Sequence, residues 1–374
     1  MLVRMNGTRT FDVASGVAAV DSLLRAAAVA GASDAHLDPR PEGVFVRFRI
    51  DGELESVGQL PLRLHEEVVA RLKILSGART DLHAVPQDGR WHAQIAGQPY
   101  NIRISFMPTY HGENAVIRLL PAGVGLPDSF AALGFTPDHA ATIGRALTAG
   151  NGLILVTGPT GSGKTTTLRV CLGLVAAAPI SVMTLEDPIE YEIPGVRHVH
   201  IRESYGVTFA AGLRSALRQD PDVIMVGEIR DNETARTAVH TALTGHLVFS
   251  TLHTVSALEA VLRLADMGVE RYLLAATLRL VVGQRLARMV CHVCEGAASA
   301  CKSCRGTGYT GRSVVAEVLE VDSGLRDLIS RGEPSSALHE YAVSRGFRPM
   351  SDDAGEKVDW GVTSREEAMR ALYS

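Results

Sequence analysis

A glycine-rich segment that ends in lysine and threonine carries the strongest chemical signal of the sequence. It reads Gly158-Pro-Thr-Gly-Ser-Gly-Lys-Thr165, fits the pattern G-x-x-x-x-G-K-[ST], follows an apolar run and opens a predicted helix. Backbone N–H groups of such a loop wrap phosphate oxygens, and the helix N-terminus adds a favourable dipole. Lys164 would reach the β- and γ-phosphates, and the Thr165 hydroxyl would hold Mg²⁺. We therefore expect ATP to be bound by the loop residues Gly158, Pro159, Thr160, Gly161, Ser162, Gly163, Lys164, Thr165 and Thr166.

Acidic and imidazole side chains lie next to three other predicted strands. Glu228 ends an apolar strand that resembles a Walker B element with Glu in place of Asp, and Glu190 ends the segment LEDPIE, which places three carboxylates after another strand. His246 and His253 flank a third strand. Ligands of open α/β sheets bind beyond the carboxyl ends of the strands, where carboxylates can orient water or coordinate Mg²⁺ and a histidine can sense the γ-phosphate. Each residue alone has an ordinary structural explanation, but together in one P-loop domain they predict a catalytic site.

Four of the five cysteines form a compact cluster in the sequence, at Cys291, Cys294, Cys301 and Cys304. Two C-x2-C pairs of thiolates suit tetrahedral Zn²⁺ in a structural site that is closed to water. A redox-active C-x-x-C pair and a chance spacing are the alternatives, and nearby basic residues also allow a zinc ribbon that binds nucleic acid. Because we expect a cytosolic chain, metal binding is favoured over disulfides.

The elements of the first part of the chain predict an α+β domain with a mostly antiparallel sheet. Periodic apolar residues predict helices and strands in this part, the helices over residues 17–30 and 62–75 and the strands over 44–50, 90–95, 100–106 and 114–120. A segment rich in Gly and Pro at residues 121–127 then interrupts the pattern. We place the domain boundary there and assign residues 1–120 to the N-terminal domain.

Strands and helices alternate beyond this break. Short apolar runs predict strands over residues 152–157, 181–185, 223–226 and 247–251, and helices are predicted from residue 164 and over 209–218 and 233–243. This alternation is typical of an α/β fold with a parallel sheet and helical crossovers. We assign residues 128–374 to this second domain, with the cysteine segment 291–304 inside it and a helical tail from Ser323 onward.

The composition excludes several classes of protein. Among the 374 residues, 37 basic and 41 acidic side chains give a net charge of −4, which argues against a protein held mainly by a nucleic-acid backbone. No run approaches 18 apolar residues, so we expect no transmembrane helix. Asp21 and Arg25 interrupt the first apolar stretch, so we expect no signal peptide and a cytoplasmic protein.

The order of these motifs resembles one family. The segments GPTGSGKTTT, LEDPIEYEI, RQDPDVIMVGEIRD and TGHLVFSTLHT are similar to the secretion ATPase superfamily, and specifically to the ATPases of type II secretion and type IV pilus assembly. The N-terminal segments SDAHLDPRPEGVFVRFRIDGEL, VPQDGRW and IRISFMPTYHGENAVIRLL resemble that family's second N-terminal domain, and the cysteine segment and the ending GYTGRSVVAEVLEV also fit. The resemblance covers roughly residues 20–372 and implies a RecA-like P-loop NTPase domain, an α+β (PAS-like) N-terminal domain and a small zinc-binding insertion.

The resemblance also implies roles for the residues of the P-loop domain. Lys164 and Thr165 correspond to the Walker A pair, and Glu190 corresponds to the glutamate that activates water in the family. Glu228 corresponds to the Walker B glutamate near Mg²⁺.

Histidines and arginines complete the set that the resemblance implies. His246 and His253 correspond to the family's His box, with His253 facing the γ-phosphate. Arg103 and Arg118 correspond to N-terminal-domain arginines that close onto the γ-phosphate. Such an arginine can contribute about 10³- to 10⁵-fold in rate, because phosphoryl transfer spreads negative charge over the equatorial oxygens.

The function that the resemblance implies is a homo-hexameric cytoplasmic motor. It would use ATP, Mg²⁺ and Zn²⁺ and act on an inner-membrane platform protein that assembles pilins or pseudopilins, without direct contact to nucleic acid. Association with the inner face of the membrane would be peripheral, through partners; longer relatives dock through a further N-terminal domain, and this chain begins almost directly with the second one. The alternatives are a nucleic-acid-translocating ATPase with a zinc ribbon and a nucleotide-binding scaffold with little turnover, which the carboxylates at Glu190 and Glu228 argue against.

Overall fold

A computed structural model describes residues 2–5, 8–11, 13–122, 127–298 and 301–373. The chain divides into two compact units, Met1–Leu126 and Pro127–Ser374, and each is described by itself below. Residues 123–126 of the expected linker lie outside the described residues.

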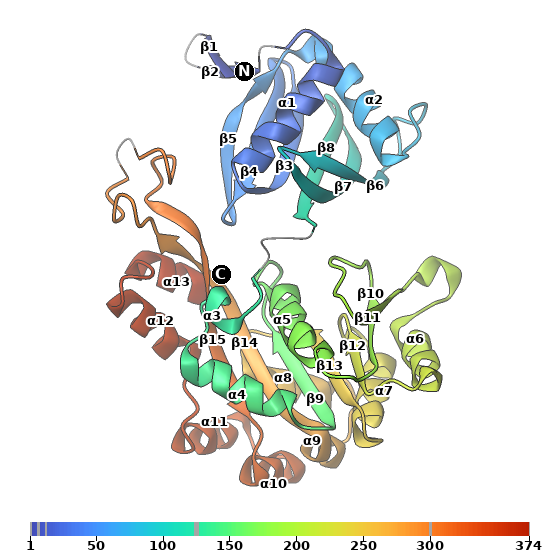
Figure 1. Ribbon diagram of the computed structural model, residues 1–374, viewed down its shortest axis with the longest axis vertical. Coiled ribbons are helices and arrows are strands. Elements are labelled where there is room, and N and C mark those ends of the chain that lie inside the picture. Colours follow the sequence, from blue (N-terminus) through green and yellow to red (C-terminus); the bar gives the residue numbers. More distant parts are fainter. Residues whose placement is uncertain (1, 6–7, 12, 123–126, 299–300, 374) are drawn as a thin grey trace. The chain divides into compact units, whose positions relative to one another are not determined.

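The first unit is built on an eight-stranded sheet with the order β1-β2-β5-β4-β3-β8-β7-β6 (Figure 1). Its strands are mostly antiparallel, as expected. The strand bounds are β1 Leu2–Met5, β2 Thr8–Phe11, β3 Ala32–Arg40, β4 Gly43–Ile50, β5 Glu53–Leu60, β6 Gln87–Ile95, β7 Gln98–Thr109 and β8 Gly112–Pro121. The expected helices are present as α1 Gly16–Val29, the 3-10 turn η1 Leu62–Leu64 and α2 His65–Ser76.

One face of this sheet is apolar and packs on α1 and α2. Ile102, Ile104 and Phe106 alternate inward along β7 and are buried in one cluster with residues of both helices. The intervening residues Arg103 and Ser105 therefore lie on the opposite, polar face, because side chains alternate along a strand.

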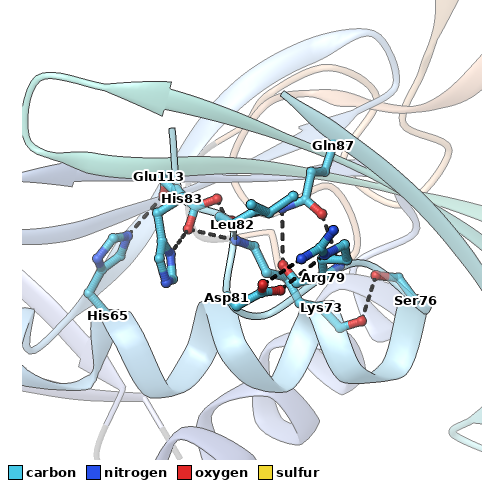
Figure 2. Close-up of polar contacts among 9 residues, drawn as sticks. All are labelled: His65, Lys73, Ser76, Arg79, Asp81, Leu82, His83, Gln87 and Glu113. Carbon is cyan, nitrogen blue, oxygen red and sulfur yellow. Dashed lines mark hydrogen bonds and ion pairs between the residues drawn. The ribbon is translucent and has the colours of Figure 1, made fainter. Parts of the chain in front are cut away.

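A buried ion pair fixes the loop between α2 and β6 (Figure 2). The Lys73 ammonium, fully buried, donates to Glu113 Oε2 at 2.8 Å and to the Leu82 carbonyl at 2.5 Å, and it lies 2.7 Å from Glu113 Oε1. His83 Nδ1 lies 2.7 Å from the same carboxylate, and Gln87 donates to the Leu82 carbonyl at 2.8 Å. Removing one partner of such a pair would cost about 3–5 kcal/mol, since the other charge would stay buried. The loop and the start of β6 are thus tied to β8.

The second unit is built on a seven-stranded sheet with the order β11-β10-β12-β13-β9-β14-β15. All neighbours pair in parallel except the β14–β15 pair. The strand bounds are β9 Gly152–Thr157, β10 Val182–Glu186, β11 Val196–His200, β12 Val223–Val226, β13 Leu247–Leu252, β14 Leu278–Val290 and β15 Tyr309–Glu320. The expected parallel α/β sheet is confirmed, and β11, β14 and β15 are strands that the sequence did not predict.

Helices cover both faces of this sheet. One buried cluster joins one face to α6 Phe209–Ala216, α7 Asn232–Leu243, α8 Ala257–Asp266 and α9 Arg271–Thr277. A second cluster joins the other face to α3 Phe130–Leu133, α4 Pro137–Leu147 and α5 Lys164–Ala176. Buried on both sides, the central strands consist mainly of apolar residues, as is typical of parallel sheets.

The C-terminal part combines a long ribbon with four helices. The ribbon β14–β15 (orange in Figure 1) leads to the loops that hold the four cysteines, residues 291–304. The predicted helical tail is confirmed as α10 Ser323–Arg331, α11 Ser335–Ser344, α12 Met350–Asp359 and α13 Arg365–Tyr373. Among the described residues, each helix is too short or too polar to cross a membrane.

Candidate active site

The expected site residues gather mainly at one edge of the second sheet. Strands β10, β12, β13 and β9 lie side by side in this order and run in parallel. Their carboxyl ends are followed by the loop with Glu190, by Glu228, by His253 and by the glycine-rich loop, respectively. The arrangement brings segments that are far apart in sequence to the edge where parallel α/β sheets bind ligands.

The glycine-rich loop is shaped as a phosphate cradle. Gly158 has a φ of +150°, and a Cβ atom there would lie 2.4 Å from the Gln284 carbonyl oxygen, so only glycine fits. Gly163 (φ +88°) is the N-cap of α5, so the helix N-terminus follows directly after the loop. The Ser162 hydroxyl is buried without a hydrogen-bond partner among the described residues. Glycine backbone, helix N-terminus and an unpaired buried hydroxyl all fit a bound phosphate.

Lys164 is held on the loop itself. Its ammonium donates to the carbonyls of Gly158 and Pro159 at 2.8 and 2.9 Å, and the residue is only 9% exposed. Burial lowers the pKa of Lys164 to about 8; Glu228 opposes this shift and Arg285 adds to it. A phosphate would bring the negative charge that this buried cation lacks.

Glu228 sits in a small charged cluster just after β12. Its carboxylate accepts from the Arg230 guanidinium at 2.6 Å and lies 3.7 Å from His253 Nε2. The pKa of Arg230 is raised by its hydrogen bond to Glu228. The pKa of His253 is lowered, first by burial and then by the charge of Lys164, so its imidazole is neutral at pH 7. The carboxylate and the neutral imidazole lie where they could contact a metal-bound phosphate.

Glu190 and His246 lie outside the charged cluster around Glu228. Glu190 lies half-buried in the loop that joins β10 to β11. His246 lies at the amino end of β13, where its Nδ1 is 3.1 Å from the Thr241 carbonyl. The structure therefore does not bring His246 to the edge that carries His253, because the whole strand β13 separates them.

Arg103 and Arg118 belong to the first unit, on the polar face of its sheet. They pair in register on β7 and β8, with Arg90 of β6 on one side and Asp34 of β3 on the other. Arg118 Nε donates to the Asp34 carboxylate at 2.8 Å, while the Arg118 side chain stays 56% exposed. Three arginines therefore lie in one cross-strand row, with Asp34 next to them.

Gln284 of β14 is a residue of the site that the sequence motifs did not reveal. Fully buried, its amide donates to the Ser162 carbonyl at 2.7 Å and accepts from the Thr167 hydroxyl at 2.8 Å. One side chain thus joins the glycine-rich loop to the first turn of α5. The sequence contains no local signal for this role, because Gln284 lies more than a hundred residues from its hydrogen-bond partners.

The four cysteines form one cluster, as expected. Their sulfur atoms all lie within 4.8 Å of one another, with Sγ–Sγ distances of 3.9 Å between Cys291 and Cys301 and 3.6 Å between Cys294 and Cys304. A tetrahedral ion with Zn–S bonds of about 2.3 Å needs Sγ–Sγ distances of about 3.8 Å. The Gly308 N–H also points at Cys304 Sγ, at 3.2 Å. The donor set and its spacing fit zinc.

Comparison with known proteins agrees with this arrangement. The family model described as Type II/IV secretion system protein matches residues 11–370. Type II secretion system protein HxcR of Pseudomonas aeruginosa is 42% identical over 96% of this chain and 78% of its own length. Type IV pilus assembly ATPase PilB of Thermus thermophilus is 39% identical over 94% of this chain and 42% of its own length. The structure of the pilus retraction motor PilT with bound ADP is 26% identical, with a TM-score of 0.66 over 94% of this chain and 96% of that chain.

The fold and the glycine-rich loop define a P-loop ATPase with a RecA-like domain, an α+β N-terminal unit and a cysteine-bearing insertion. The expected fold class is therefore confirmed. The chain belongs to the type II/IV secretion system protein family.

Proposed function

We propose that this chain is a hexameric motor that hydrolyses ATP to drive the assembly of pilins or pseudopilins in type II secretion or type IV pilus biogenesis. The single observation that carries the proposal is the phosphate cradle of residues 158–165 at the sheet edge that also holds Glu228 and His253. Family membership supports the coupling to secretion or pilus assembly, since relatives carry those names.

The residues of the second unit would divide the work of hydrolysis. The loop 158–166 would hold the phosphates of ATP, with Lys164 exchanging its carbonyl partners for phosphate oxygens. Thr165 and Glu228 would hold Mg²⁺, which would neutralise charge on the phosphates. Glu190 would orient and deprotonate the attacking water, and His253 would contact the γ-phosphate. His246, at the other end of β13, would act on the placement of that strand.

The first unit would supply arginines. We propose that residues 1–120 form the family's second N-terminal domain, residues 121–127 its linker and residues 128–374 the ATPase domain. Arg103 and Arg118 would close onto the γ-phosphate and stabilise the charge of the transition state. Arg118 suits this role, because its Nε is held by Asp34 while the side chain remains largely exposed.

The cysteine cluster would be a structural zinc site. Cys291, Cys294, Cys301 and Cys304 would hold one Zn²⁺ per chain and so order the loops at the end of the β14–β15 ribbon. Binding of structural zinc is worth roughly 10–16 kcal/mol at neutral pH, so these loops would depend on the metal.

The partners would be further copies of this chain and an inner-membrane platform protein. Association with the inner face of the cytoplasmic membrane would be peripheral and would pass through partners, and no direct contact with nucleic acid is proposed. The nucleic-acid-translocating alternative is not favoured, since the family matched is one of secretion proteins.

ATP turnover by the purified chain is the direct test. The chain should release phosphate from ATP in the presence of Mg²⁺, and Lys164→Ala should abolish turnover while the thermal unfolding profile stays close to wild type. Sedimentation in the presence of a non-hydrolysable ATP analogue should show a hexamer. Turnover that persists in a folded Lys164→Ala protein, or that needs single-stranded DNA, would contradict the proposal.

A further inference from the structure

The loop that carries Glu190 lacks regular structure of its own. Within the described chain, residues 187–195 form neither helix nor strand, although they join two paired strands, β10 and β11. If Glu190 is to hold a water molecule in one place, something else must fix this loop. Misplacing a catalytic group by about 1 Å can cost about 10²-fold in rate.

His198 of β11 makes the connection that the loop needs. Its Nε2 accepts a hydrogen bond from the Ile193 backbone N–H at 3.0 Å, three residues after Glu190. Its Nδ1 lies 2.9 Å from the Glu186 carboxylate and 2.8 Å from the Thr184 hydroxyl, both on β10. One imidazole therefore ties the loop to the last residue of the neighbouring strand.

The hydrogen bonds define which nitrogen of His198 carries the proton. Because Nε2 accepts from a backbone N–H, the proton of the neutral ring must lie on Nδ1, where it faces the Glu186 carboxylate. Thr184 completes the group by donating its hydroxyl proton to the same Glu186 oxygen at 2.6 Å. Only 10% of the His198 side chain and 8% of the Glu186 side chain are exposed, so water competes little for these bonds.

A carboxylate that orients an imidazole is also found in catalytic pairs, but here the lone pair of Nε2 is already used by a backbone amide. His198 is thus unable to accept a proton from substrate or water without releasing the loop. We propose that His198, oriented by Glu186, is a positioning residue that holds the loop 187–195 and thereby sets the place of Glu190 in ATP hydrolysis. This inference rests on the proposed function, because it assumes that Glu190 acts on the attacking water.

Substitutions of His198 can separate this role from a general loss of structure. Gln can reproduce the order of the groups, with an amide N–H toward Glu186 and an amide oxygen toward the Ile193 N–H. Asn carries the same amide but is one carbon shorter, so it should fail to span both partners. His198→Asn and His198→Leu should lower kcat about 10- to 100-fold, with the KM for ATP within about twofold of wild type. His198→Gln should recover kcat to within about threefold, and His240→Leu, at an exposed position of α7, should leave it unchanged.

Hydrogen–deuterium exchange of the same proteins measures directly how well the backbone amides of the loop are protected. Peptides that cover residues 187–195 should exchange faster in His198→Asn and His198→Leu than in wild type, and His198→Gln should restore protection. The inference is overturned if His198→Asn keeps both the wild-type kcat and the wild-type exchange, or if His198→Gln is as impaired as His198→Leu. A wild-type chain that does not hydrolyse ATP would instead refute the proposed function, and the exchange rates would still show whether His198 holds the loop.

Discussion

We expect the buried cation of the P-loop, Lys164, to make the affinity for ATP depend on pH. Lys164 has a pKa of about 8 without nucleotide, lowered from 10.5 mainly by burial, and only its charged form should pair with phosphate. If the neutral form does not bind, the apparent Kd rises by a factor of 1 + 10^(pH − pKa). With a pKa of about 8, the affinity should fall roughly tenfold between pH 7 and pH 9. His253 does not interfere, because its lowered pKa leaves it neutral over this range.

Rising pH should change the stability of the fold through Lys164 in the opposite direction to the affinity for ATP. The pKa of Lys164 is lower in the folded chain than in the unfolded chain, so folding opposes the charge and this cost is fully present below pH 8. The cost disappears as the pH rises from about 8 towards 10.5. As the pH rises above about 8, Lys164 should therefore raise the free energy of unfolding of the nucleotide-free protein, while the affinity for ATP declines. A general loss of structure at alkaline pH would instead lower both the free energy of unfolding and the affinity for ATP.

Isothermal titration with a non-hydrolysable ATP analogue and Mg²⁺ measures the coupling. In buffers with different ionisation enthalpies, binding at pH 9 should take up close to one proton per site, and binding at pH 7 should take up almost none. Lys164→Ala should bind the analogue weakly at both pH values, and its affinity should not fall between pH 7 and pH 9. An affinity that is flat between pH 7 and pH 9, or a step of equal size in Lys164→Ala, would refute the reasoning.

Four further predictions concern other parts of the protein. Glu190→Gln should lower kcat about 10²- to 10⁴-fold while the ATP analogue still binds, as measured by phosphate release and titration. Gln284→Leu should weaken ATP binding and lower the free energy of unfolding by about 2–6 kcal/mol, because two buried partners are left unpaired; adding Thr167→Val should recover part of the stability. Elemental analysis should find one zinc per chain, and Cys291→Ser should lose it while ATP binding remains. Arg118→Ala should lower kcat about 10³-fold or more with little change in affinity for the analogue, and near wild-type turnover would remove it from the mechanism.

Local sequence patterns were sufficient where one segment contains its own signal. The glycine-rich loop and the central strands β9, β10, β12 and β13 are short apolar runs or fixed motifs, and the structure has them within a residue or two of the predicted bounds. The cysteine spacing likewise predicted a single cluster of four sulfur atoms.

The features that sequence patterns missed depend on contacts between distant segments. Strand β3, Ala32–Arg40, contains Pro39 and mixes polar and apolar residues, yet it is central in its sheet because β4 and β8 pair with it on either side. The ribbon β14–β15 alternates less regularly than an exposed strand, because most of it is buried between helices. Gln284 and His198 belong to no motif, and only the fold brings their hydrogen-bond partners near.

The pair Arg118–Asp34 bears on the role proposed for the first unit, because it sets the orientation of the Arg118 guanidinium. Arg118 is 56% exposed but Asp34 is only 8% exposed, so separating the two would cost more than the about 0–1 kcal/mol of a fully exposed ion pair. Asp34 is not left isolated when this happens, because the Ser33 hydroxyl also donates to its carboxylate, at 2.8 Å. The contact uses Nε, so the terminal nitrogens of Arg118 can turn to a phosphate even before Asp34 is released. The carboxylate thus orients the guanidinium and leaves its terminal nitrogens available, as the role proposed for Arg118 requires.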